Sequence, residues 1–174
     1  MIKEFLRRRS LRKDASVEPT ALLPLQAVTS AVAFIDVRDP GFDSCKNAIM
    51  AFYREKGIKG EIFFFDFRKI DKGERLITSI NTTVLLKDLN WYGRPSREKA
   101  RIMLEGNPDL LLSLLPAADY PLEYMVRCST ARFKVGRGQL PGNVFDLVAL
   151  DPPGQALSQA DAFREIVKLL EKIQ

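Results

Sequence analysis

The sequence predicts a three-layer α/β domain, in which a mostly parallel sheet of about five or six strands has helices on both faces and follows a basic N-terminal arm. Short apolar, partly β-branched runs alternate along the chain with amphipathic helical patterns, the order that builds parallel sheets. The run at 62–67 (IFFFDF) is almost continuously apolar, which is typical of a strand covered on both faces. The 174 residues, 46% of them hydrophobic, suffice for one sizeable core.

Six apolar runs have the length and composition of strands. In chain order they are residues 31–37 (AVAFIDV), 62–67 (IFFFDF), 80–86 (INTTVLL), 109–115 (DLLLSLL), 132–135 (RFKV) and 145–150 (FDLVAL).

Helix signals lie between and after these runs. Helices are expected to begin at 41–44, Ser96, Asp119 and Ser158. Gly57 suits the left-handed residue that ends the first of them, because glycine adopts that conformation without strain. Ser158 and Asp161 have the spacing of a capping box at the start of the last.

Positive charge is concentrated at the N-terminus. Residues 1–14 carry six basic and two acidic groups, a net +4 of the chain's +5. The basic residues are Lys3, Arg7, Arg8, Arg9, Arg12 and Lys13. The rest of the chain is nearly neutral, unlike the basic body expected of a nucleic-acid-binding domain.

The chain divides into three parts. Residues 1–14 are predicted to be a basic amphipathic arm, because apolar residues recur at helical spacing beside the charges. Residues 15–29 contain two prolines and no strong period, so they are expected to be a linker. Residues 30–174 are expected to form a single α/β domain.

Composition excludes several kinds of chemistry. The chain has no histidine, so His-dependent nucleophiles and His-ligated zinc are excluded. Cys45 and Cys128 have no metal-type spacing and are interpreted as small buried thiols. We predict no metal site and no cofactor. No run is apolar enough to span a bilayer or to serve as a secretory signal, so the expected location is the cytoplasm, either free or peripheral to the inner membrane.

Carboxylates follow several predicted strands. Asp36, Asp66 and Asp151 stand at or just after strand ends, and in open α/β sheets ligands bind beyond the carboxyl ends of the strands. Converging carboxylates could hold Mg²⁺, but no metal motif matches their spacing. The favoured interpretation is therefore that they cap strand ends and turns.

Two loops could also contact a ligand. The segment 89–95 (LNWYGRP) contains Trp91, the chain's one tryptophan, and Tyr92. A lid whose aromatic side chains pack over the sheet edge is favoured over a loop that contacts ligand, although a lid can do both. The glycine-rich loop 134–143 (KVGRGQLPGN) lacks the spacing of a dinucleotide fingerprint, so it is interpreted as a connection between two strands.

The order of several motifs resembles that of a known family. The basic start, LNWYGRP, the strand PDLLLSLLP, CSTARFKVG and FDLVALD are similar to a bacterial family of small uncharacterised proteins, whose members show an Asn-Trp-aromatic-Gly loop and a Phe-Lys-Val-Gly segment. Pro108 stands where that family has phenylalanine. Residues 107–138 bear a weaker likeness to the acceptor-side half of heptosyltransferases. Because the chain is too short for the second domain that those enzymes need, the likeness implies a half-site relic or a binding module.

Two functions from different classes remain open. The first is a non-catalytic α/β module that binds an acidic partner or an anionic membrane through its N-terminal arm. The alternative is a protein or enzyme that binds a nucleotide, sugar or phosphate at the carboxyl edge of the sheet, with Asp36, Asp66, Asp151, Trp91 and Tyr92 as its site residues. Nucleic-acid binding is limited to the arm.

Overall fold

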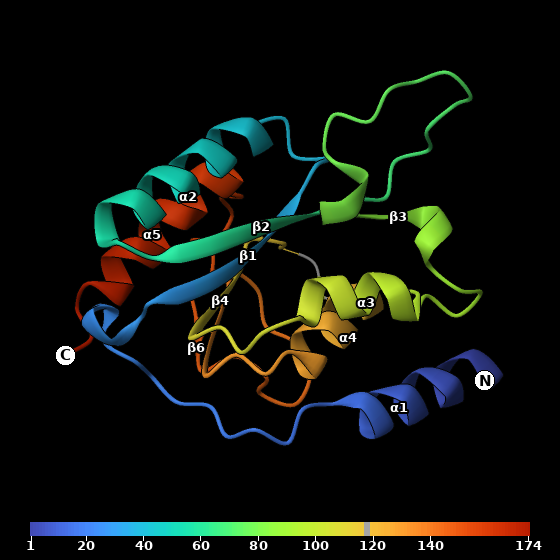
Figure 1. Cartoon of the computed structure of the whole chain (residues 1–174), viewed down its shortest axis with the longest axis horizontal. Coiled ribbons are helices and arrows are strands. Elements are labelled where there is room, and N and C mark those ends of the chain that lie inside the picture. Colours follow the sequence, from blue (N-terminus) through green and yellow to red (C-terminus); the bar gives the residue numbers. More distant parts are fainter. Residues whose placement is uncertain (117–118) are drawn as a thin grey trace.

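A computed structural model describes residues 1–116 and 119–174 (Figure 1). Within these residues, six strands form one parallel sheet with the order β3-β2-β1-β4-β5-β6, which confirms the predicted fold class. The strands are β1 (Ser30–Asp36), β2 (Lys59–Asp66), β3 (Thr83–Leu85), β4 (Leu110–Ser113), β5 (Phe133–Gly136) and β6 (Leu147–Val148).

Helices cover both faces of the sheet. They are α1 (Ile2–Asp14), α2 (Phe42–Lys56), α3 (Arg97–Leu104), α4 (Tyr120–Cys128) and α5 (Gln159–Leu170). Figure 1 shows α2 and α5 on one face and α3 and α4 on the other, with α1 outside α4. Alternate residues of the strands supply the two cores, so that Ile35 faces α2 and α5 while Phe34 faces α3 and α4.

The helix boundaries match the expected signals closely. Gly57 ends α2 with φ +66°, and the Ser96 side chain accepts a hydrogen bond from the Lys99 amide at the start of α3. At α5, the Ser158 hydroxyl accepts from the Asp161 amide. These local signals predicted the ends well because each depends on residues within one helical turn.

The third and sixth strands are shorter than expected. Residues 80–82 form a 3-10 turn, which leaves three residues in β3, and β6 keeps only two. Both strands lie at the edges of the sheet, where each pairs with one neighbour only. A strand with one neighbour has fewer ladder hydrogen bonds to extend it.

The sheet order places a switch point between β1 and β4. From β1 the chain proceeds outward to β2 and β3, and it then returns to β4 and continues in the opposite direction. The segment 15–29 lies against the body, where the Ser16 amide donates to Arg127 O (2.8 Å) and the Ala21 amide to Arg132 O (2.9 Å).

No helix in the described part of the chain is both long and apolar enough to cross a membrane.

Candidate functional site

The carboxylates predicted at the sheet edge are each bound by an arginine. Asp36 accepts from Arg38 Nε (3.0 Å) and Nη2 (2.8 Å). On the neighbouring strand, Asp66 accepts from Arg68 Nε (2.7 Å) and Nη2 (2.8 Å). The carboxylates are buried and the arginine side chains are about 40% exposed, at 43% and 39%. The fork of Arg68 holds the pKa of Asp66 below its usual value.

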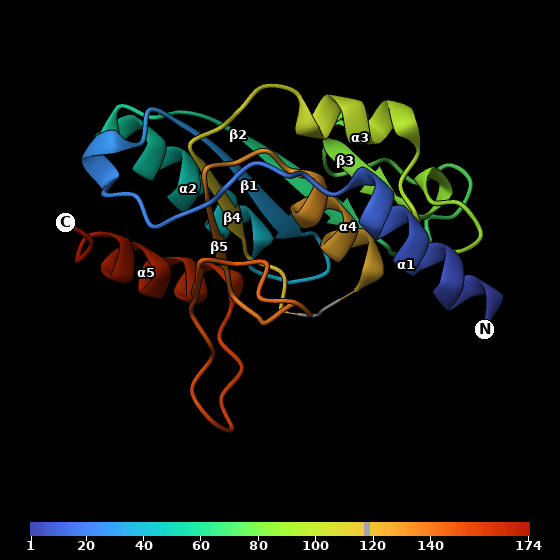
Figure 2. The same cartoon turned by 90° about the horizontal axis from the view of Figure 1, so that it is seen from below.

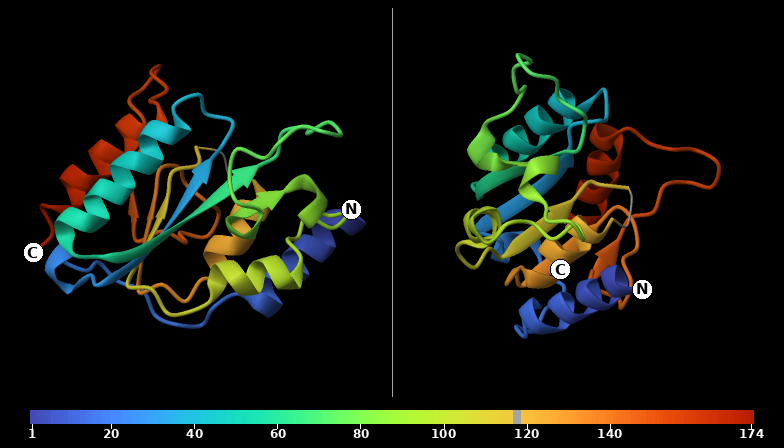
Figure 3. Two further views of the ribbon diagram at one scale, coloured as in Figure 1. Left: turned by 45° about the horizontal axis from the view of Figure 1, so that its top comes forward. Right: turned by 90° about the vertical axis from the view of Figure 1, so that its right-hand side faces the viewer.

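The third predicted carboxylate holds a loop in place. Asp151 accepts from Arg137 Nε (3.1 Å) and Nη2 (2.8 Å), and it also accepts from the Leu157 amide (3.2 Å). Arg137, which is 3% exposed, binds Leu157 O as well. The pair therefore ties together the two ends of the segment between β6 and α5 (orange to red), which projects from the molecule in Figures 2 and 3. Its arginine lowers the pKa of Asp151.

The structural interpretation of Asp36, Asp66 and Asp151 accounts for these contacts, and ligand binding by them stays a prediction. Both Asp36 and Asp66 also accept from the backbone amide two residues later, as carboxylates do when they cap a turn. Among the described residues, no group of three or more acidic, cysteine or histidine side chains is arranged to hold a metal ion.

The pairing of these carboxylates with arginines was not predicted from the sequence. The tripeptides 36–38 (DVR) and 66–68 (DFR) end two adjacent strands with the same Asp-x-Arg pattern. The register pairs Asp36 with Phe65, so the two patterns meet at one edge, offset by one residue. The repetition was visible in the sequence and could have shown that each carboxylate brings its own cation.

Close to the switch point, the end of β1 is bound by a side chain of α5. Gln159, at the start of α5, is fully buried. Its Nε2 donates to Asp36 O (2.7 Å), its Oε1 accepts from the Asp36 amide (2.7 Å), and its own amide donates to Asp39 Oδ2 (3.1 Å). Gln159 therefore fastens α5 to the end of β1 in the place where many α/β proteins bind a ligand.

The loop 89–95 forms a tight turn and does not bury its tryptophan. The Gly93 amide donates to Asn90 O (2.9 Å), and Asn90 Oδ1 accepts from the amides of Tyr92 and Arg94. Asparagine at the first position and glycine at the fourth, here with φ +93°, are typical of such turns. Trp91 is 66% exposed at the tip. The lid interpretation is therefore wrong for Trp91, while Tyr92 is half-buried, with its ring 6.4 Å from that of Tyr120.

One face of α1 packs against the rest of the protein. The Arg7 guanidinium donates to Tyr92 O (2.7 Å) and lies 4.9 Å from the centre of the Tyr120 ring. Ser10 is buried and shares a hydrogen bond with the Tyr120 hydroxyl. Because these contacts join α1 to α4 and to the 89–95 turn, Arg7 serves packing, and the other basic residues of α1 remain as candidates for binding.

The rest of the surface of α1 is open. It carries the exposed cations Lys3, Arg8, Arg9, Arg12 and Lys13. None of these five forms an ion pair with any described residue. Ile2 is 71% and Phe5 56% exposed on the same helix. This combination of unpaired cations and open apolar groups is a candidate binding surface, hereafter the outer face of α1.

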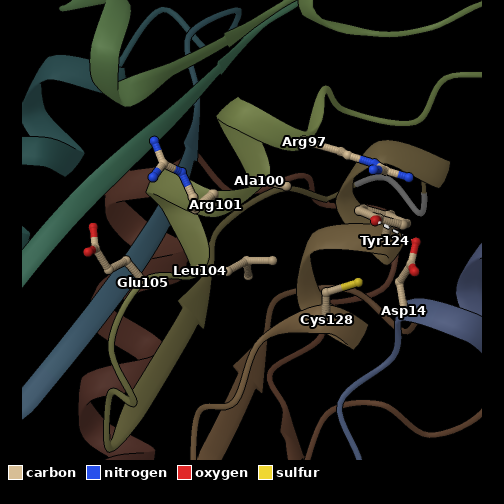
Figure 4. Close-up of a pocket in the computed structure, with 8 residues that line it drawn as sticks. All are labelled: Asp14, Arg97, Ala100, Arg101, Leu104, Glu105, Tyr124 and Cys128. Carbon is tan, nitrogen blue, oxygen red and sulfur yellow. Dashed lines mark hydrogen bonds between the residues drawn. The ribbon is translucent and has the colours of Figure 1, made fainter.

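A shallow hollow of about 450 Å³ lies between α3 and α4, beside the end of α1 (Figure 4). The Tyr124 hydroxyl points toward Asp14 and donates to it (2.8 Å), so this hydrogen bond also fastens α1 to α4. Cys128 reaches the hollow, but burial raises the pKa of its thiol to about 11. A thiol that stays protonated at neutral pH is a poor nucleophile. Cys128 and Cys45 are both free.

The basic residues near the glycine-rich loop have partners. Lys134 is buried and donates to Val126 O (2.8 Å), and burial lowers its pKa. Arg132 binds Asp109 (3.1 Å). Residues 137–146 connect β5 to β6, as expected, although these strands are parallel and the connection must therefore cross back along the sheet.

The strand order and the layers define a doubly wound α/β domain. A family model described as "Family of unknown function (DUF6913)" matches residues 24–173, and the chain belongs to this family. The matched range includes the 89–95 turn and begins after α1. No curated protein and no solved structure gives a significant match. The expected membership of an uncharacterised family is confirmed, and the likeness to heptosyltransferases stays a prediction.

Proposed function

We propose that the protein is a non-catalytic α/β module that binds an anionic membrane surface through the outer face of α1. The observation that carries this proposal is the division of α1 into two faces. Arg7, Ser10 and Asp14 hold the helix on the body, while five cations remain exposed and unpaired on the outer face. A rigidly held helix presents its charges to a flat surface without first having to fold.

The exposed cations of α1 are numerous enough to give measurable binding to an anionic bilayer. Each basic residue near an anionic bilayer surface contributes about 1 kcal/mol, so five give about 5 kcal/mol at low salt. Ile2 and Phe5 add apolar area that an interface can bury. Salt screens the first contribution but not the second.

Trp91 lies close to this helix. Tyr92, the next residue, contacts Arg7, and Figures 1 and 2 both place the segment before α3 near the N-terminal half of α1. Tryptophan prefers the membrane interface, because its ring is apolar and its N–H is polar. The exposed Trp91 therefore suits a second contact with the same surface.

The test is co-sedimentation with vesicles of phosphatidylglycerol and phosphatidylcholine, compared with vesicles of phosphatidylcholine alone. We expect binding to the anionic vesicles only, weaker at high salt, together with a blue shift of emission from Trp91, the chain's one tryptophan. The double variant Arg8→Glu/Arg9→Glu should bind at least about 30-fold more weakly, because two attractive contributions are lost.

The matched control carries the same change of charge on the opposite layer. Arg54→Glu/Lys172→Glu replaces exposed residues of α2 and of the chain end after α5 and should bind like the wild type. Equal binding by both double variants would contradict the proposal. Binding to polyglutamate but not to vesicles would favour an acidic protein partner instead, and binding only to RNA with a steep salt dependence would favour nucleic acid.

A further inference from the structure

We propose a second site, independent of α1, which binds a small phosphorylated compound with an apolar body at the carboxyl ends of β2 and β3. The site is a hollow of about 490 Å³ beneath the loop that follows β2, the green loop at the upper right of Figure 1. This volume lies within the range of small-molecule sites, about 300–1,000 Å³. Its lining residues are Asp66, Arg68, Lys69, Ile70, Glu74, Leu76, Leu85, Leu86 and Lys87.

The Arg68 side chain is already held in one orientation by Asp66. Asp66 is wholly buried and takes the Nε and Nη2 side of the guanidinium. The Nη1 group makes no hydrogen bond to any described residue, and 39% of the side chain is exposed. A buried carboxylate thus fixes the arginine while part of its fork stays open, so that an incoming anion need not order the side chain itself.

Two further cations lie around Arg68. Lys69 and Lys87 line the same hollow, and neither forms an ion pair among the described residues. Glu74 is the acidic group that remains, because Asp66 is buried against Arg68. The three cations outnumber the two carboxylates of the lining by one charge, and this net positive charge suits a phosphate monoester, whose charge is about −1.5 to −2 at neutral pH.

Part of the lining of the hollow is apolar. Ile70, Leu76, Leu85 and Leu86 complete the hollow, and Leu86 is 47% exposed. A free inorganic anion would leave these side chains in water. A ligand with a short apolar body would cover them while its phosphate meets the cations, and area of this kind contributes about 25 cal/mol for each Å² buried.

The position of the hollow fits the fold. Ligands of parallel α/β sheets bind beyond the carboxyl ends of the strands. Gln159 binds the end of β1, whereas a hollow lies at the ends of β2 and β3. Arg38 stands beside this edge in the same Asp-x-Arg arrangement, with its guanidinium 5.9 Å from the ring centre of Phe67, the residue before Arg68.

The experiment titrates the full chain with n-hexyl phosphate, inorganic phosphate and n-hexanol by calorimetry. We expect saturable 1:1 binding of hexyl phosphate, with inorganic phosphate and hexanol each at least about tenfold weaker, because each probe supplies only half of the contacts. Lys69→Gln/Lys87→Gln should weaken hexyl phosphate binding about tenfold, and Arg68→Lys, which keeps the charge but loses the fork, should also weaken it.

The control separates this site from the membrane proposal. Lys3→Gln/Lys13→Gln removes two charges from the outer face of α1 and should leave hexyl phosphate binding unchanged, while Lys69→Gln/Lys87→Gln should leave vesicle binding unchanged. The proposal is overturned by absence of saturable binding, by equal affinity for inorganic phosphate and hexyl phosphate, or by equal losses in the two double-lysine variants.

Discussion

The acidic residues at the sheet edge and the basic residues of α1 differ in what lies next to them. In the sequence both were interpreted as groups of like charge. In the structure Asp36, Asp66 and Asp151 each meet an arginine fork, whereas the exposed cations on the outer face of α1 meet no carboxylate among the described residues. The number of charges in a segment therefore says little about how many of them are available for binding. The carboxylates at the sheet edge stabilise the fold through their arginines, whereas the unpaired cations of α1 remain free to bind.

The largest loss in the free energy of unfolding is expected when an arginine–carboxylate pair is broken. In Asp151→Asn the guanidinium of Arg137, 3% exposed, loses its counter-charge while remaining buried. Removing one partner of a buried pair costs about 3–5 kcal/mol, and we expect about 3 kcal/mol because Asp151 itself is 24% exposed. Urea unfolding measures the loss. The control is Asp71→Ala, which changes an exposed carboxylate that has no side-chain partner among the described residues and should leave the free energy of unfolding unchanged. An equal loss in this variant would contradict the stabilising role of the Asp151–Arg137 pair.

Acid should weaken the same pairs. The pKa values of Asp66 and Asp151 are lower in the folded protein than in the unfolded chain, so their contribution is complete above about pH 4 and is lost as pH falls through the folded values. The free energy of unfolding, followed by urea titration from pH 7 to pH 2, should therefore drop below about pH 4. Asp151→Asn should show a shallower drop, and a curve parallel to that of the wild type would contradict the assignment.

The docking of α1 can be loosened at Gly93. This residue has φ +93°, and a Cβ there would lie 3.3 Å from Arg7 Nη2. Gly93→Ala should cost about 1–2 kcal/mol in backbone strain and should also raise amide exchange in α1. Gly73→Ala is a matched control, because Gly73 has φ +96° and nothing lies within 4 Å of its added Cβ. It should lose similar stability while α1 exchange stays at the wild-type rate.

The smallest effect is expected on the outer face of α1. Arg8→Ala/Arg9→Ala removes two exposed cations that have no ion-pair partner among the described residues, so the free energy of unfolding should change by less than about 0.5 kcal/mol. Thermal unfolding measures it. A loss as large as that of Asp151→Asn would mean that these arginines stabilise the fold, and the contrast with the sheet edge would disappear.

Much of the fold was predictable because its signals are local. Gly57, Ser96 and Ser158 set helix ends through contacts within one turn, and the alternation of strands and helices predicted the parallel sheet. The lengths of β3 and β6 were overestimated, because the sequence does not say which strands lie at the edges. Even the Asp36–Arg38 and Asp66–Arg68 pairs, two residues apart, could have been found from the sequence.

The layers, the helix boundaries and the basic character of α1 could be derived from the sequence, because they follow from periodicity, capping and composition. Three other features depend on the folded structure: Arg137 is paired with Asp151, Ser10 and Arg7 fasten α1 to the body, and Trp91 is exposed. The physical reason is distance along the chain. Ser10 and Tyr120, for example, are 110 residues apart in sequence, and folding alone brings such groups together.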